Sequence, residues 1–212
     1  MRIAILGTGT LAAALGSRWV AAGHEVVVAG RSPDRAEETA RRLGARACAP
    51  RAAVAGADAV LLAVAWSGVE DILRAAGAGD RTLGGTTLID PTNAIDHGVG
   101  ALLTPPGTSG AGHIAALAPG AHVVKAFHLF PAGQWSDPAN PPVTVTICGD
   151  DPHALAVTET LIRDAGSRST VLGPLARARQ LEEVAGFAIG LIFRGADPRD
   201  ALPAAPAHIP GG

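Results

Sequence analysis

The chain has 212 residues, 48% of them hydrophobic and 17% charged, a composition typical of one folded domain or of one domain with a small appendage. Its formal net charge is −2 and Lys125 is its only lysine, so it lacks the clustered basic charge of nucleic-acid and membrane-surface proteins. Its two cysteines, Cys48 and Cys148, do not have the spacing of a metal or redox motif. We therefore expect no nucleic-acid partner, no membrane partner and no metal ion.

The apolar stretches of the chain are short. Residues 3–6 are too few for the core of a signal peptide. Residues 57–66 and 184–193 are the longest apolar stretches, and each has about half of the ~20 residues that a membrane-spanning helix needs. We expect a cytoplasmic protein.

Short apolar runs alternate with alanine-rich helical stretches, which is the pattern of βαβ units around a parallel sheet. Strands are expected at residues 2–6, 25–29, 57–65, 86–89, 121–126 and 143–147. Helices are expected at residues 10–22, 33–43, 152–165 and 176–193. Residues 93–112 are rich in glycine and proline and predict a long loop, and the tail from about residue 197 is expected to be extended or mobile.

Residues 7–12, Gly-Thr-Gly-Thr-Leu-Ala, fit the pattern G-x-G-x-x-G/A between the first strand and an amphipathic helix. Gly7 would allow a tight turn, Gly9 would let the backbone approach a pyrophosphate, and Ala12 would permit close packing of helix on strand. The N-terminus of the helix would present free N–H groups to the phosphates. A glycine turn that serves packing alone is the alternative, but its place between strand and helix favours dinucleotide binding.

The end of the second strand indicates which dinucleotide would bind. NAD-binding sites place an aspartate or glutamate there, to accept hydrogen bonds from the ribose. This chain has no carboxylate at that point and has Arg31 and Arg35 instead. A guanidinium can hold a 2′-phosphate through paired hydrogen bonds, whereas two solvated arginines on a surface helix are the alternative. The pattern favours NADP(H).

These features predict an α/β fold, a Rossmann-type doubly wound parallel sheet with a small C-terminal α/β extension. Residues 1–125 would form the NADP-binding domain, and residues 126–212 a small region for substrate binding or dimerisation. The second half of the helix at 176–193 is apolar almost all round, so it must be buried in the core or against a second subunit. We therefore expect a homodimer.

Beyond the glycine turn, the chain resembles the NADPH:coenzyme F420 oxidoreductases, small proteins that move a hydride between NADP(H) and a deazaflavin. The resemblance covers nearly the whole chain up to about residue 202 and is carried by residues 64–67, 124–132, 148–151 and 173–182. Two departures stand out. Gly30 replaces a serine that helps to bind the 2′-phosphate, and residues 103–112 match the family poorly.

The resemblance implies NADP(H) as cofactor and coenzyme F420 as co-substrate. In that family Thr8, Gly9, Thr10 and Leu11 would cradle the pyrophosphate, Arg31 and Arg35 would hold the 2′-phosphate, and Val64 and Ala132 would line the nicotinamide side. The full set of expected cofactor contacts is Gly7, Thr8, Gly9, Thr10, Leu11, Ala12, Arg31, Ser32, Arg35, Val64, Ala65, Trp66, Ala132 and Leu175.

His128 is the expected catalytic residue. It follows a strand at its carboxyl end, where ligands bind in open α/β sheets, and it falls where the family has a histidine beside the deazaflavin. A histidine with purely structural hydrogen bonds is the alternative. Hydride transfer depends on aligning two rings and needs no general acid, so His128 is expected to act by positioning. Trp66 would wall the cofactor cleft or, alternatively, cover the sheet edge.

Other chemistries have weaker support in the sequence. Asp150 and Asp151 are interpreted as a turn and helix N-cap before Pro152, and the other histidines form no i,i+4 pair for a metal. The chain has no G-x-S-x-G nucleophile motif. Two further functions stay open: an NADPH-dependent imine or ketone reductase, which normally needs a longer helical dimerisation domain, and a non-catalytic NADP(H)-sensing module.

Overall fold

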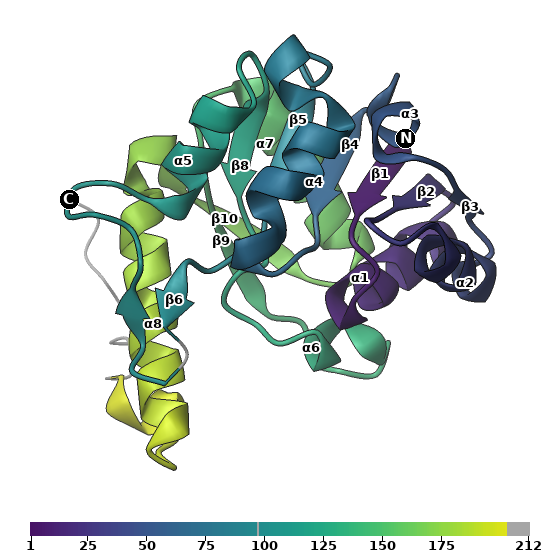
Figure 1. The fold of residues 1–212 in the computed structure, drawn as a ribbon. Helices are drawn as coiled ribbons and strands as arrows, with labels where there is room; N and C mark the ends of the chain where they lie inside the picture. The colour runs from purple at the N-terminus through teal and green to yellow at the C-terminus, as the bar shows by residue number, and fades with distance from the viewer. Residues whose placement is uncertain (97, 203–212) are drawn as a thin grey trace.

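The computed structural model describes residues 1–96 and 98–202, and its centre is an eight-stranded sheet in the order β10-β9-β8-β5-β4-β1-β2-β3 (Figure 1). The strands are β1 (Arg2–Leu6), β2 (Glu25–Ala29), β3 (Arg46–Ala47), β4 (Ala59–Leu62), β5 (Thr87–Asp90), β8 (His122–Lys125), β9 (Thr144–Gly149) and β10 (Arg168–Gly173). Neighbouring strands are parallel except β8 and β9. The predicted doubly wound α/β fold is confirmed: the order in which the chain adds strands to the sheet reverses between β1 and β4, although these two strands run parallel.

Helices cover both faces of the sheet (Figure 1). They are α1 (Thr10–Ala21), α2 (Pro33–Leu43), α3 (Pro50–Val54), α4 (Val69–Ala76), α5 (Gly110–Leu117), α6 (Gly133–Ser136), α7 (Pro152–Asp164) and α8 (Ala178–Phe193). Alternate residues of β1 point to opposite faces, so Ile3 and Ile5 join one core and Ala4 and Leu6 join the other. The first core lies against α1, α2, α6 and α7, and the second against α3, α4 and α5.

The segments before and after residue 125 share one sheet and one core. The fully buried Trp19 of α1 donates its indole N–H to the main-chain oxygen of Leu161 in α7 over 2.9 Å. Its ring also meets Phe127 edge to face, with 6.2 Å between the ring centroids. The expected C-terminal α/β extension is thus continuous with the main sheet through β9, α7 and β10.

The two antiparallel strands overlap only near their ends. Val124 pairs with Gly149, and Lys125 pairs with Cys148. Because β9 begins at Thr144, its residues 144–147 continue past the last residue of β8. Strands β9 and β10 therefore overhang the edge at which the parallel strands end.

Several boundaries differ from the prediction. Strand β4 ends at Leu62, and residues 63–65 leave it for the short helix η1 (Trp66–Gly68). The predicted loop at 93–112 contains an antiparallel hairpin, β6 (Ile95–Asp96) and β7 (Ala101–Leu102), and the first turn of α5. The helix expected from residue 176 begins as η3 (Leu175–Arg177), and α8 follows it. Strands β3 and β10 and helices α3 to α6 have no predicted counterpart.

The expected mobile tail falls partly within the described residues. Its beginning forms one short turn, η4 (Pro198–Ala201), next to α8. Residues 203–212 and His97 lie outside the described part of the chain. Within residues 1–96 and 98–202, no helix is long and apolar enough to span a membrane, and no three His, Cys, Asp or Glu side chains gather to hold a metal ion.

Candidate functional site

The glycine turn joins β1 to α1 as the motif requires. A Cβ atom on Gly7 would lie 1.9 Å from the main-chain oxygen of Ala63, and Gly7 has a φ of +140°, so no other residue fits. A Cβ atom on Gly9 would instead meet nothing within 4 Å. No side chain caps the N-terminus of α1, whose N-cap is Gly9. The turn thus leaves helix N–H groups and open space together, which is the arrangement that binds a phosphate group.

A cavity of about 480 Å³ opens in front of this turn, at the carboxyl ends of β1, β2 and β4. Its lining includes eight of the expected cofactor contacts: Gly7, Thr8, Gly9, Arg31, Ser32, Arg35, Val64 and Ala65. The structure adds Gly30, Ala63, Ser67 and Gly68. Three strands that are far apart in sequence therefore contribute to one nucleotide-sized cavity.

The other expected contacts lie outside this lining. Thr10, Leu11 and Ala12 belong to α1, and Ala12 is buried against the sheet. Ala132 is the N-cap of α6, and the main-chain N–H of Leu175 donates to Asp150 over 2.9 Å. Asp151 is the N-cap of α7, as predicted. The cavity lining thus includes most of the expected phosphate-side residues and Val64 of the nicotinamide side, and it leaves out Thr10, Leu11 and Ala132.

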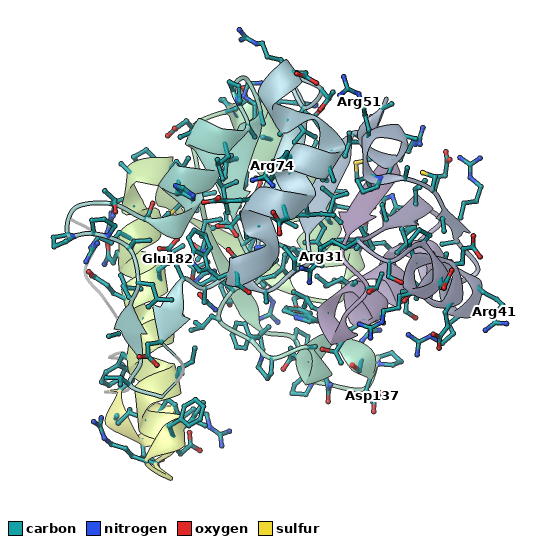
Figure 2. All side chains as sticks on the ribbon, in the orientation of Figure 1. Arg31, Arg41, Arg51, Arg74, Asp137 and Glu182 are labelled. Carbon is teal, nitrogen blue, oxygen red and sulfur yellow. The ribbon has the colours of Figure 1, made fainter. Side chains whose placement is uncertain are left out.

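The two arginines in the cavity lining, Arg31 and Arg35, are positioned by the residues that begin α2. The hydroxyl of Ser32 accepts a hydrogen bond from the main-chain N–H of Arg35 at 3.4 Å, and Pro33 occupies the first helical turn, as predicted. This start places Arg31 and Arg35 in the same lining (Figure 2 labels Arg31). Within the described residues, neither guanidinium has an ion-pair partner, and no carboxylate lines the cavity. The wall can therefore accept a further phosphate.

A second cavity, of about 600 Å³, lies on the other side of the turn that follows β4. Its lining is Trp66, Leu103, Thr104, Pro105, Gly107, Thr108, Ser109, Gly112 and His113. Trp66 packs on His113 with 5.7 Å between ring centroids, and His113 pairs with Glu70 at 3.2 Å. Trp66 thus lines this second cavity, whereas its neighbours Ala65 and Ser67 line the first.

Three charged side chains are fully buried between β5, β8 and α8. The Lys125 ammonium lies 2.9 Å from Asp90 and 3.2 Å from Glu182, and it also donates to the main-chain oxygen of Thr92. Glu182, labelled in Figure 2, accepts the main-chain N–H groups of Gly110 at 2.8 Å and Ala111 at 3.1 Å. The cluster joins two strand ends, α8 and the N-terminus of α5, and every charge in it has a partner.

His128 follows β8, as expected, but it is 93% buried and lines neither cavity. Burial, reinforced by the charge of Lys125, lowers the pKa of its imidazole to about 3. Neither ring nitrogen has a hydrogen-bond partner among the described residues. Its main-chain oxygen accepts the side-chain amide of Asn93 at 2.7 Å. The imidazole is therefore neutral near pH 7 and cannot act as a cationic acid there.

Sequence reasoning missed the charge cluster. Its members are distant in the chain, and only their fold brings them together. One signal was present: Lys125, the only lysine, follows two valines in a strand that ought to be wholly apolar. Glu182 ends one of the segments that carried the family resemblance.

The chain is similar in sequence and in fold to proteins that are already known. Residues 2–94 match the sequence profile of the family described as NADP oxidoreductase, coenzyme F420-dependent. The crystal structure of a protein of Arthrobacter sp. FB24 assigned as an F420-dependent NADP-reductase superposes with a TM-score of 0.81 at 28% identity. The match covers 92% of this chain and 96% of that one.

Two further proteins share parts of this similarity. The metalloreductase STEAP3 of Rattus norvegicus is 30% identical over 191 residues, which is 86% of this chain and 36% of that protein. The chain therefore spans about a third of its relative's length. A reductive aminase of Aspergillus terreus superposes with a TM-score of 0.67 at 22% identity, covering 92% of this chain and 62% of that one. The last comparison shows a shared fold.

Proposed function

We propose that the chain, whose residues 2–94 match the profile of the coenzyme F420-dependent NADP oxidoreductases, transfers a hydride between NADP(H) and the deazaflavin coenzyme F420. One observation carries the NADP(H) half of this proposal. A single cavity combines the open glycine turn with two arginines that lack counter-charges, and no carboxylate faces them. A phosphorylated ribose would complete this arrangement, whereas the free ribose hydroxyls of NAD would leave the arginines without a partner.

The residues of the cavity would divide the binding between them. Main-chain N–H groups at the start of α1, where Thr10 and Leu11 follow Gly9, would hold the pyrophosphate. Arg31 and Arg35 would hold the 2′-phosphate beside Ser32. Val64 and Ala65, which follow β4, would contact the part of the cofactor that continues toward the nicotinamide. Gly30 contributes space: a Cβ atom there would lie 3.0 Å from the methyl group of Thr8.

The bound cofactors would supply the hydride donor and the hydride acceptor, and the protein would supply alignment. Holding two rings at reacting distance can contribute about 7–11 kcal/mol through orientation. His128, neutral at physiological pH, would support the β8 end without donating a proton. The charge cluster of Lys125, Asp90 and Glu182 would fix the neighbouring strand ends, α5 and α8 around the reacting rings.

The direct test is to mix the protein with NADPH and purified coenzyme F420 and to follow the deazaflavin absorption band. We expect reversible reduction that depends on NADPH. Oxidation of NADPH by an imine or ketone, with no change in the deazaflavin, would replace this proposal with the imine or ketone reductase alternative. NADPH binding without turnover of any acceptor would favour the sensing module.

We also propose that the protein is a homodimer through α8. The helix was expected to be buried, yet Phe187 is 47% exposed, and Ile192 and Phe193 are each 60% exposed. Val99, beside the β6–β7 hairpin, is 60% exposed as well. The second half of α8 extends beyond the sheet (Figure 1). Exposed apolar side chains gathered at one end of a helix are typical of a protein interface, and the same side chains of a second copy would match them in chemistry.

A further inference from the structure

The cavity lined by Trp66 and residues 103–113 was unexpected, because residues 103–112 match the family poorly. Its volume of about 600 Å³ is within the range of small-molecule sites, about 300–1,000 Å³. It needs an explanation of its own, because the His128 position, where the family resemblance would place the acceptor, is buried and opens into neither cavity.

The walls of this cavity are held in place by α8 and by the helix α5. The guanidinium of Arg179 donates to the main-chain oxygens of Pro105 and Thr108, each over 2.8 Å. Glu182 binds the first N–H groups of α5, and the Ser109 hydroxyl accepts the N–H of Gly112 at 3.0 Å. The loop is therefore ordered before a ligand arrives, which lowers the entropic cost of binding.

The chemistry of the lining selects among ligand classes. Within the lining there is no lysine, arginine, aspartate or glutamate. The N–H groups at the start of α5 are occupied by Glu182 and Ser109, so this helix offers no anion site. A substrate whose recognition depends on a carboxylate or phosphate would have no lysine or arginine partner here, and His113, which also lines the cavity, is paired with Glu70. The cavity therefore suits a neutral group.

The hydroxyl groups of Thr108 and Ser109 each keep one unused hydrogen-bonding capacity, and together these suit the polar edge of a heterocycle. The hydroxyl of Thr108 donates to the Pro105 oxygen over 2.8 Å, so its own oxygen is left to accept. The hydroxyl of Ser109 accepts from Gly112, so its hydrogen is left to donate. Trp66 provides an aromatic surface in the same lining. Donor, acceptor and aromatic surface together match a planar ring that carries both N–H and C=O groups.

The position of Trp66 places this cavity next to the nucleotide cavity. The turn at residues 63–68 presents Ala65 and Ser67 to the first cavity and Trp66 to the second. We infer that the second cavity binds the neutral fused heteroaromatic ring of the hydride acceptor, with Trp66 as its stacking wall. This inference rests on the proposed function for the identity of the acceptor.

The test fills the cavity without touching the nucleotide site. In Thr108→Trp, the new indole would occupy the space assigned to the acceptor ring, and Thr144→Trp, exposed at the start of β9, is the matched control. Calorimetry would measure binding of coenzyme F420, of riboflavin as a neutral fused-ring probe, and of NADPH. We expect Thr108→Trp to weaken both ring ligands at least about tenfold, about 1.4 kcal/mol, and to leave the NADPH dissociation constant within about twofold.

A second variant keeps the test decisive if Thr108→Trp does not fold. Trp66→Ala removes the stacking wall, and it should weaken the ring ligands by about tenfold or more with unchanged NADPH affinity. Wild-type binding of neither ring ligand, or ring affinities unchanged in a folded variant, would overturn the inference. Ring binding that Thr108→Trp abolishes, without reduction of coenzyme F420 by NADPH, would support the cavity assignment and contradict only the proposed function.

Discussion

Arg31 and Arg35 are cations that face a cavity with no counter-charge in its lining. If they hold a 2′-phosphate, the protein should bind NADPH more tightly than NADH by at least about tenfold, about 1.4 kcal/mol. Arg31→Ala should remove most of this preference. Arg41→Ala, exposed near the other end of α2 and labelled in Figure 2, should keep it. Titration of both cofactors measures the ratio, and equal wild-type affinities would contradict the assignment.

His128 should make stability depend on pH. The pKa of its imidazole is about 3 in the folded protein and 6.5 as its ordinary value, so between these values the unfolded chain holds a proton that the folded chain lacks. The free energy of unfolding is therefore unaffected by this residue above about pH 6.5. As the pH falls from there toward 3, it decreases by up to about 1.4 kcal/mol per pH unit.

Urea denaturation at pH 6.5, 5.5 and 4.5 measures this effect. The free energy of unfolding of His128→Gln should decline less steeply with falling pH than that of the wild type. Identical slopes in the two proteins would contradict the lowered pKa of His128 in the folded state.

At the scale of whole elements, the buried charges of Lys125, Asp90 and Glu182 hold two strands and two helices together. Lys125→Met would leave both carboxylates without their cation and should destabilise the fold by about 3–5 kcal/mol. Arg46→Met breaks an ion pair whose side chains are 71% and 52% exposed, so it should cost less than about 1 kcal/mol. Urea denaturation compares the two variants. Similar losses would mean that the buried cluster contributes no more than a surface pair.

The elements with strong local patterns were the predictable ones. Strands β1 and β2 and helix α2 match their predicted ranges, because continuous apolar runs and the Ser32–Pro33 helix start are visible in the sequence itself. Strand β10 was missed because it carries serine, threonine and glycine and has no buried residue. Such a strand is held by its neighbour β9, and no local pattern reports that pairing.

The same distinction applies to the candidate site: residues in local motifs were predicted, and contacts between distant residues were not. Gly7, Gly9, Arg31 and Arg35 stand in motifs whose chemistry depends on adjacent residues, and the fold gathers them in one cavity. The cluster around Lys125 depends on contacts between residues that the sequence separates widely, so no spacing rule could reveal it.

At the scale of the whole molecule, the exposed apolar surface of α8 should control assembly. Phe187→Asp places a charge on this surface and should convert a dimer of the wild-type chain into a monomer. Val171→Asp, on strand β10 with 45% of its valine exposed, is the matched control and should remain dimeric. Light scattering coupled to size exclusion gives the masses. A monomeric wild type at micromolar concentration would contradict the proposed dimer.

Strands β9 and β10 extend beyond the carboxyl ends of the parallel strands, so they form a step at one side of the edge where the candidate cofactor cavity lies. The carboxyl ends of β2, β1, β4, β5 and β8 form a shelf, and residues 144–147 rise past its end at β8. A ligand lying across the strand ends would meet residues 144–147 past β8, whereas β3, on the other side, ends opposite Val28 and does not overhang β2. If Arg31 holds the 2′-phosphate, the adenine end of a dinucleotide would lie near β2 and its reactive ring would point toward this step. The step would then limit how far a ligand can extend beyond the reactive ring.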